Sequence, residues 1–248
     1  PAFMQVLDIS RRAAELAKCD LTTEMVKEFT DLQGVIGGIY ARVQGEPEPV
    51  AQAIYDHYKP LSMEDSIPST PEGKIVALAD KLDTLRGCFK IGLVPTGSKD
   101  PFALRRAAQG VVKILVEGKL NYSLSALCAG DETLREFLLD RIRYYFRDVR
   151  GFKYDEVNAA LKAGSEDLVN LEARLTALQA VRPTEDFEPL AAAFKRIQNI
   201  LKQAGVTGAG TIAPALLEDG PEKDLHAAFT AVREEIKGLD FQPALARI

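Results

Sequence analysis

The sequence contains few of the residues that build metal centres. Only two of its 248 residues are histidines, His57 and His226, and only three are cysteines, Cys19, Cys88 and Cys128. Two scattered imidazoles are too few for a histidine-based metal site, and we expect each to be structural or exposed. The cysteines are odd in number and far apart, which argues against a disulfide framework and against a zinc knuckle. This composition disfavours metal-hydrolase chemistry and fits the reducing cytoplasm.

The sequence also lacks an excess of positive charge and any long apolar run. Its formal net charge is −5, so any contact with nucleic acid must come from local basic patches. No apolar run reaches the roughly 18 residues of a membrane span, and we expect no membrane contact. The first residues, "PAFMQVLDISRRAAELAKCD", are typical of a helix already under way rather than of a signal peptide. We therefore interpret the chain as a fragment of a longer protein.

Alternation of apolar and polar residues, which marks half-buried strands, is missing as well. Helical periodicity is present instead in nearly every segment. In the segment 8–29, apolar residues recur every three or four positions: Ile9, Ala13, Leu16, Leu21, Met25 and Val26. The sequence therefore predicts an all-α fold. A weak spacer at residues 118–123 predicts two helical domains, residues 1–120 and 121–248.

Residues 92–115, "GLVPTGSKDPFALRRAAQGVVKIL", begin like a phosphate-binding loop but depart from its pattern. A Walker A loop ends in Gly-Lys-Ser/Thr, because the lysine must reach the terminal phosphates while the hydroxyl binds magnesium. Here the order is Ser98 and then Lys99, and the preceding segment has helical periodicity. We expect a helix start instead, with Asp100 as its cap and Pro101 in its first turn.

Three cations gather at that expected helix start: Lys99, Arg105 and Arg106. Positive charge at this end of a helix opposes the helix dipole and costs a little stability. The cluster would suit a phosphodiester or a carboxylate of a partner. A solvated face or an internal salt bridge explains it equally well.

Two further helical segments combine cations with aromatic or amide side chains. One contributes Arg141, Arg143 and Tyr144, and the other contributes Lys195, Arg196 and Asn199. Aromatic faces, guanidinium planes and amides hold unstacked bases, and lysines hold phosphates, so these residue types match the recognition of single-stranded RNA. Basic amphipathic helices are also common as ordinary solvated faces.

Asp80 and Asp83 lie three residues apart on one expected helix face. Two carboxylates at this spacing can bind a cation. Such a pair is also commonly a polar edge, or the salt-bridge partner of a neighbouring Lys81 or Arg86.

Three stretches together resemble one known family: "LAKCDLTTEMVKEFTDLQGVIGGIYA", "ALADKLDTLRGCFKIGLVPTGSKDPFALRRAAQGVVKIL" and "FKRIQNIL". They are similar to the β subunit of bacterial heterotetrameric glycyl-tRNA synthetase. The resemblance implies an enzyme in which the α subunit makes glycyl-adenylate with ATP and magnesium while the β subunit binds tRNA. It also implies that this chain is the C-terminal part of β, with a helical HD-like domain followed by a helical anticodon-binding domain of the DALR type.

The resemblance further implies where an HD-type metal site would lie. HD-domain phosphohydrolases bind metal with a histidine, a His-Asp pair and a later aspartate, and these last two appear here as Cys19-Asp20 and Asp80. A thiol must be deprotonated before it binds a metal, and it prefers softer metals than imidazole does. We interpret the site as vestigial, with no bound metal and no hydrolysis.

For RNA binding, the resemblance implies a role for the residues that match the family's stretches, namely Lys195, Arg196, Asn199, Arg141, Arg143, Tyr144, Lys99, Arg105 and Arg106. The expected partners are tRNA(Gly) and the α subunit, and the chain itself is expected to hold no catalytic residue and no cofactor. The family continues beyond this chain's last residues, so we expect a truncated anticodon domain.

Two alternatives stay open on sequence alone. A working HD-type phosphohydrolase would need metal at Asp20 and Asp80, which a metal assay would detect. A module that only docks the α subunit would lose that subunit when Arg105 or Arg106 is reversed in charge, and would keep its tRNA affinity.

Overall fold

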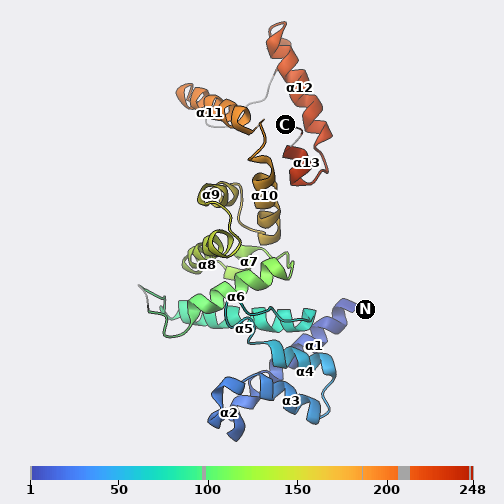
Figure 1. Cartoon of the computed structure of the whole chain (residues 1–248), viewed down its shortest axis with the longest axis vertical. Helices are drawn as coiled ribbons and strands as arrows, with labels where there is room; N and C mark the ends of the chain where they lie inside the picture. Colours follow the sequence, from blue (N-terminus) through green and yellow to red (C-terminus); the bar gives the residue numbers. More distant parts are fainter. Residues whose placement is uncertain (1, 97–98, 186, 206–212, 246, 248) are drawn as a thin grey trace. The chain divides into compact units, whose positions relative to one another are not determined.

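The computed structural model describes residues 2–96, 99–185, 187–205, 213–245 and 247. All regular elements in these residues are helices, which confirms the predicted all-α fold (Figure 1). The α-helices up to residue 117 are α1 (Ala2–Leu16), α2 (Glu24–Glu28), α3 (Val35–Val43), α4 (Glu48–Asp56), α5 (Pro71–Lys90) and α6 (Leu104–Glu117). Those that follow are α7 (Leu124–Cys128), α8 (Glu132–Tyr144), α9 (Tyr154–Lys162), α10 (Leu168–Val181), α11 (Phe187–Gln203), α12 (Pro221–Glu235) and α13 (Phe241–Leu245). Short 3-10 turns are η1 (Cys19–Thr22), η2 (Thr30–Leu32) and η4 (Pro214–Leu216), and η3 (Tyr145–Val149) is a π-helical turn.

The chain forms two compact units, Pro1–Leu171 and Glu172–Ile248. The first unit extends past residue 120, where the sequence placed a domain boundary, because α6 packs against α8 and η3. One contact between these elements is the hydrogen bond of 3.1 Å that the Tyr145 hydroxyl donates to Glu117 Oε1. The HD-like and anticodon-binding character of the two predicted domains stays a prediction.

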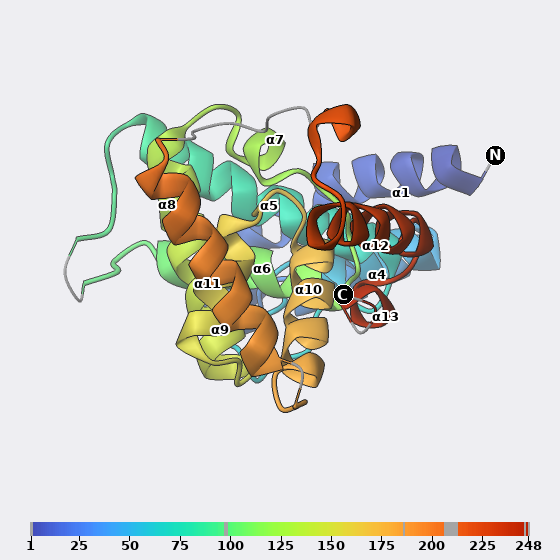
Figure 2. The same cartoon turned by 90° about the horizontal axis from the view of Figure 1, so that it is seen from above.

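The core of the first unit begins where α1, α4 and α5 meet, and Figures 1 and 2 show α1 beside α5. Ala13, Ala51 and Val76 supply small buried side chains there, and Ile54 fills the space between them. Helix α3 approaches α4 so closely that a Cβ on Gly38 would lie 2.6 Å from Tyr55 Cβ. Only glycine fits at this crossing without a shift of α3 away from α4.

In the sequence, Ser69 or Thr70 followed by Pro71 marks a helix start, and helix α5 begins there. Thr70 Oγ1 accepts a hydrogen bond of 3.0 Å from the Gly73 N–H, and Pro71 occupies the first helical position. An N-cap hydroxyl of this kind satisfies one backbone N–H that has no partner inside the helix. This cap fixes where α5 begins, and α5 carries Asp80 and Lys81 in its middle turns.

The second unit has few buried side chains among its described residues. Helices α11 and α12 bury none, although both are amphipathic. Their large exposed apolar side chains include Phe194, Ile197, Ile200, Leu201, Leu225 and Phe229. The cations of α11 therefore lie beside exposed apolar and aromatic surface.

Candidate functional site

The predicted HD-type residues lie on two elements of the first unit. Asp20, on η1, is buried, and its Oδ2 accepts the N–H groups of Gly34 at 2.6 Å and Gly37 at 3.2 Å. Asp80 lies on α5, and Cys19 is exposed. No cluster of three or more His, Cys, Asp or Glu side chains that could hold a metal is present among the described residues.

A lysine occupies the space in front of Asp80. Lys18 Nζ lies 2.9 Å from Asp80 Oδ1 and 3.1 Å from His57 Nε2, and it stands 3.8 Å above the ring of Tyr58. The side chain therefore places its ammonium group between a carboxylate, an imidazole and an aromatic face. The sequence allowed Asp80 to bind a cation, to form a polar edge or to pair with Lys81 or Arg86; in the structure Asp80 does form a salt bridge, but with Lys18.

The chemistry of the contacts fixes the His57 tautomer. His57 is fully buried, and its Nδ1 lies 2.6 Å from the carbonyl oxygen of Ile54. A carbonyl can only accept, so Nδ1 carries the proton and Nε2 accepts from the Lys18 ammonium. Burial lowers the pKa of His57 below 6.5, and the nearby charge of Lys18 lowers it further, while the hydrogen bond to Ile54 acts in the opposite direction. His57 is therefore structural, as the sequence suggested.

Lys81, which follows Asp80 on α5, is also held by a polar contact. It is buried and donates a hydrogen bond of 2.9 Å to the carbonyl oxygen of Tyr58. Its burial lowers its pKa to about 8. Gly110 on α6 leaves room for it, since a Cβ there would lie 2.6 Å from Lys81 Cε. Two lysines, Lys18 and Lys81, thus tie α5 to residues 57 and 58 at the end of α4.

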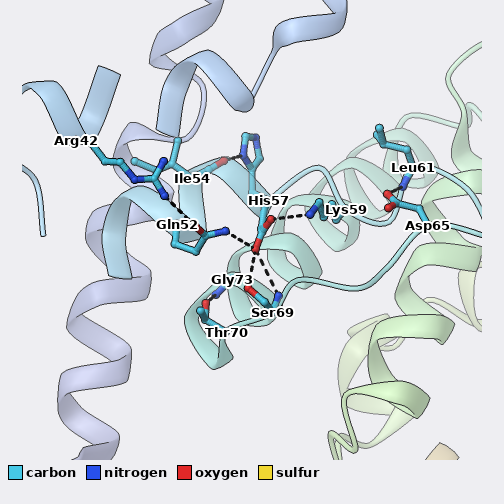
Figure 3. A network of polar contacts seen from close by, with 11 residues as sticks. Arg42, Gln52, Ile54, His57, Lys59, Leu61, Asp65, Ser69, Thr70 and Gly73 are labelled. Atoms are coloured by element: carbon cyan, nitrogen blue, oxygen red, sulfur yellow. Dashed lines mark hydrogen bonds and ion pairs between the residues drawn. The ribbon is translucent and has the colours of Figure 1, made fainter. Parts of the chain in front are cut away.

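The segment after α4 is anchored by a second polar network, which centres on Asp56 (Figure 3). Its Oδ2 accepts hydrogen bonds from Gln52 Nε2 at 2.9 Å and from Ser69 Oγ at 3.1 Å. Its Oδ1 lies 3.0 Å from Lys59 Nζ. Asp56 is only 1% exposed, so this carboxylate joins α4 to the segment that precedes α5 from inside the core.

Replacing Lys18 with methionine is expected to lower the free energy of unfolding by about 1–2 kcal/mol, because His57 loses a charge-assisted partner. The folded pKa of His57 lies below its unfolded value of 6.5, so stability should fall as pH drops below 6.5. Without the Lys18 charge the pKa of His57 rises toward its unfolded value. The loss of stability between pH 6.5 and lower pH should therefore be smaller in Lys18→Met than in the parent protein. Urea unfolding at about pH 7.5 and 5.5 measures both effects.

Lys27→Met provides the matched control, because Lys27 forms an exposed ion pair with Glu24 at 2.7 Å and, among the described residues, makes no hydrogen bond to His57. It should leave the pH dependence unchanged. An equal pH dependence in the parent protein and in Lys18→Met would contradict the assigned contact between Lys18 and His57.

The start of α6 is closed by a carboxylate. Asp100 accepts the N–H groups of Leu104 at 2.8 Å and Arg105 at 3.0 Å, which confirms its predicted capping role. The helix itself begins at Leu104, so the prediction of Pro101 in its first turn was wrong. Ala103 has φ of +55°, a left-handed conformation through which a right-handed helix cannot run.

The cations at this end therefore do not surround a row of free N–H groups. Arg105 Nη1 donates to the carbonyl oxygen of Lys99 at 2.8 Å, and Arg106 is exposed. A cavity of about 270 Å³ beside them is lined mainly by apolar side chains, including Leu93 and Phe102. Ser98, part of the apparent phosphate-binding pattern, lies outside the described residues.

The predicted RNA-contacting residues of α8 are partly engaged within the protein. The Arg141 guanidinium lies 5.4 Å from the Phe137 ring centroid, and its buried Nε has no hydrogen-bond partner among the described residues. Arg143 pairs with Asp140 at 2.7 Å. Tyr144 is exposed. Phe137 precedes Arg141 by four residues on α8, a spacing that places two side chains side by side, so the sequence could have indicated this contact.

The three predicted residues of α11 are all exposed: Lys195, Arg196 and Asn199. They belong to the second compact unit, whereas Arg141, Arg143 and Tyr144 belong to the first. The structure therefore brings each set of three together on its own helix and places the two sets in different units.

Comparison with known proteins decides the family. A model of the family described as "Glycyl-tRNA synthetase beta subunit" matches residues 2–162. The chain belongs to this family. The matched residues include Lys18, His57 and Asp80 as well as the cations at the start of α6, and they end before α11.

Curated relatives extend the similarity over nearly the whole chain. The glycine–tRNA ligase beta subunit of Acidobacterium capsulatum is 51% identical over 96% of this chain and 37% of its own length. That of Myxococcus xanthus is 42% identical over 96% of this chain and 37% of its own length. A third, from a Janthinobacterium species, is 43% identical over 90% of this chain and 33% of its own length. The chain thus spans about a third of the length of these relatives.

Within the part of the chain that the structure describes, no helix is both long and apolar enough to cross a bilayer.

Proposed function

We propose that this chain is a tRNA-binding, non-catalytic part of a glycine–tRNA ligase beta subunit in the cytoplasm. In this role it holds tRNA(Gly) while the α subunit, which uses ATP and magnesium, attaches glycine. The family membership carries the proposal, since the beta subunit match covers residues 2–162. By holding the anticodon end of the tRNA, the chain would fix where the acceptor end falls in the other subunit, which is a positional contribution to catalysis.

Helix α11 is the proposed contact with unpaired bases. Lys195 and Arg196 are exposed cations that suit phosphates, and Asn199 on the same helix suits a base edge. Phe194 is 55% exposed beside them and offers a face for stacking. Arg143 and Tyr144 on α8, and Lys99, Arg105 and Arg106 at the start of α6, are secondary candidates. Arg141 is the weakest candidate, because it already stacks on Phe137.

The phosphohydrolase alternative is disfavoured by the surroundings of Asp80. The Lys18 ammonium stands 2.9 Å from its carboxylate, in the position where a metal ion would need to bind. A second positive charge at that distance would be repelled. The residues present therefore do not fit an HD-type metal ion, and we derive no hydrolytic step. The docking alternative places the α subunit at Arg105 and Arg106 and is tested separately below.

Binding of labelled tRNA(Gly) to the chain across a salt series tests the proposal. We expect saturable binding that weakens with salt, with a slope in log K against log salt of about 0.7 to 0.9 for each neutralised phosphate. Because the chain is acidic overall, such a slope requires local cationic contacts rather than a general attraction. Absence of binding at about 50 mM salt would contradict the proposal.

A further inference from the structure

The turn between α8 and α9, residues 147–154, is a largely exposed and positively charged part of the first unit. It starts within η3 and ends with Tyr154, the first residue of α9. The turn contains three basic residues and one acidic residue, in a chain whose net charge is −5. The three basic residues are all exposed: Arg147, Arg150 and Lys153. None of them is among the candidates named from the sequence.

Buried aromatic rings anchor this turn. Tyr145 and Phe146, just before it, are fully buried, and the ring centroids of Phe146 and Phe152 lie 6.1 Å apart. The Phe152 N–H donates a hydrogen bond of 3.0 Å to the carbonyl oxygen of Phe146, which closes the backbone over these rings. Gly151 has φ of +77°, a conformation that glycine adopts without strain. The exposed cations are therefore carried by a backbone that the core holds in place.

Two of the three cations are also held by neighbouring side chains. Burial raises the pKa of the Tyr145 hydroxyl to about 12, and a hydrogen bond from Arg150 acts in the opposite direction. This contact positions the Arg150 guanidinium beside a buried group. Arg147 Nη2 lies 2.8 Å from Asp148 Oδ2, and both side chains are substantially exposed. An ion pair of this exposed kind is weak, so it leaves Arg147 able to meet another anion.

Lys153 and Tyr154 place a cation and an aromatic face side by side in the sequence at the start of α9. The Lys153 N–H donates to Glu156 Oε2 at 2.9 Å, so a backbone group caps the helix and the ammonium group is not needed there. Tyr154 is 67% exposed and therefore contributes little to the core. Asp148 raises the pKa of Arg147 most, and Tyr154 adds to this effect, so the Tyr154 hydroxyl lies close to the Arg147 guanidinium.

The chemistry of the turn favours an RNA backbone over a protein partner. Arginine and lysine side chains contact phosphates, and an exposed tyrosine ring can stack on an unpaired base. The centre of a protein interface is usually apolar and depleted of charged residues. Within residues 147–154, all of which the structure describes, Val149 is the only exposed aliphatic side chain. The turn also follows directly after Arg143 and Tyr144, which end α8 and are already candidates for RNA contact.

We propose that the turn between α8 and α9 holds the sugar–phosphate backbone of tRNA, with Arg150 and Lys153 against phosphates and Tyr154 stacked on an unpaired base. Phosphates carry no sequence information, and stacking tolerates any base, so this contact adds affinity without reading the anticodon. The inference rests on the proposed tRNA-binding function. It adds a backbone contact in the first unit to the base contacts proposed for α11.

The variants Lys153→Glu and Tyr154→Ala test this contact, and the fold should tolerate both because the two side chains are exposed. Each should weaken binding of tRNA(Gly) about tenfold at about 50 mM salt. Lys153→Glu should also lower the slope of log K against log salt by about one. The loss should be the same for a tRNA with altered anticodon bases, because its backbone is unchanged. Lys153→Arg and Tyr154→Phe should keep the parent affinity, since they keep the charge and the ring.

Lys162→Glu is the matched control, because Lys162 is an exposed cation at the other end of α9. It should leave the affinity for both tRNAs unchanged. Absence of tRNA binding by the parent chain would contradict the proposed function and this inference together. If the parent chain binds tRNA, parent-like affinity in both Lys153→Glu and Tyr154→Ala would overturn this inference alone. So would a loss confined to the tRNA with the unaltered anticodon, or a variant that loses the α subunit but keeps its tRNA affinity.

Discussion

Replacing Asp56 with alanine is expected to lower the free energy of unfolding by about 3 kcal/mol. Its carboxylate is 1% exposed and accepts hydrogen bonds from Gln52 and Ser69 while it pairs with Lys59. Removing it leaves these groups without their acceptor at the junction of α4 and the segment before α5. We place the loss at the lower end of the range for buried pairs, because Ser69 and Lys59 can regain water.

The destabilisation caused by Asp56→Ala should also depend on pH. Burial raises the pKa of the Asp56 carboxyl, but the hydrogen bonds from Gln52 and Lys59 outweigh burial, so that its pKa lies below 3.8. A lowered folded pKa stabilises the protein above about pH 3.8, and this stabilisation is lost as the pH falls further. The difference in free energy of unfolding between the parent protein and Asp56→Ala should therefore become smaller as the pH falls below about 3.8.

Urea unfolding followed by circular dichroism measures both effects. Asp65→Ala is the matched control, because Asp65 lies in the same segment and accepts the Leu61 N–H at 3.0 Å near the surface. It should cost less than about 1 kcal/mol. A loss in Asp56→Ala no larger than in this control would show that the network is not needed to hold the segment.

The second large effect is expected on RNA. Reversing two charges of α11, Lys195→Glu with Arg196→Glu, should weaken tRNA(Gly) binding about 100-fold at low salt, because two phosphate contacts become repulsive. Both side chains are exposed, so the fold should tolerate the change. The slope of log K against log salt should decrease at the same time, by about one to two.

Arg233→Glu on α12 is the matched control, since Arg233 is an exposed cation of the same compact unit outside the proposed surface. A loss of tRNA affinity equal to that of the control would contradict the proposed contact at α11.

A parallel variant, Arg106→Glu at the start of α6, tests the docking alternative. That alternative predicts that the variant no longer binds the α subunit but keeps its tRNA affinity.

Local sequence signals predicted the helices and several of their ends. The periodicity of apolar residues gave the all-α fold, and Thr70 and Asp100 were identified as caps because their hydrogen bonds reach only a few residues along the chain. The sequence did not predict that α6 begins as late as Leu104. Ala103, just before it, has a positive φ, and an alanine in the sequence gives no sign of that conformation, which glycine adopts more readily.

Contacts between residues far apart in the sequence could not be predicted in this way. Lys18 meets His57 across 39 positions, and its pairing with Asp80 depends on how α1 packs against α5. A periodic pattern shows which face of a helix is apolar but not which helix covers it. The division into compact units after Leu171 was equally hidden, because it falls inside the continuous helix α10 and leaves no linker signal.

The most direct test of tRNA recognition compares the affinity of this chain for tRNA(Gly) with its affinity for the same tRNA carrying altered anticodon bases, over one salt series. The account predicts about a tenfold or greater preference for the unaltered anticodon, a preference that Arg196→Glu abolishes. Equal affinities for the two tRNAs, with equal salt slopes, would contradict the claim that this chain holds tRNA(Gly) by its anticodon end.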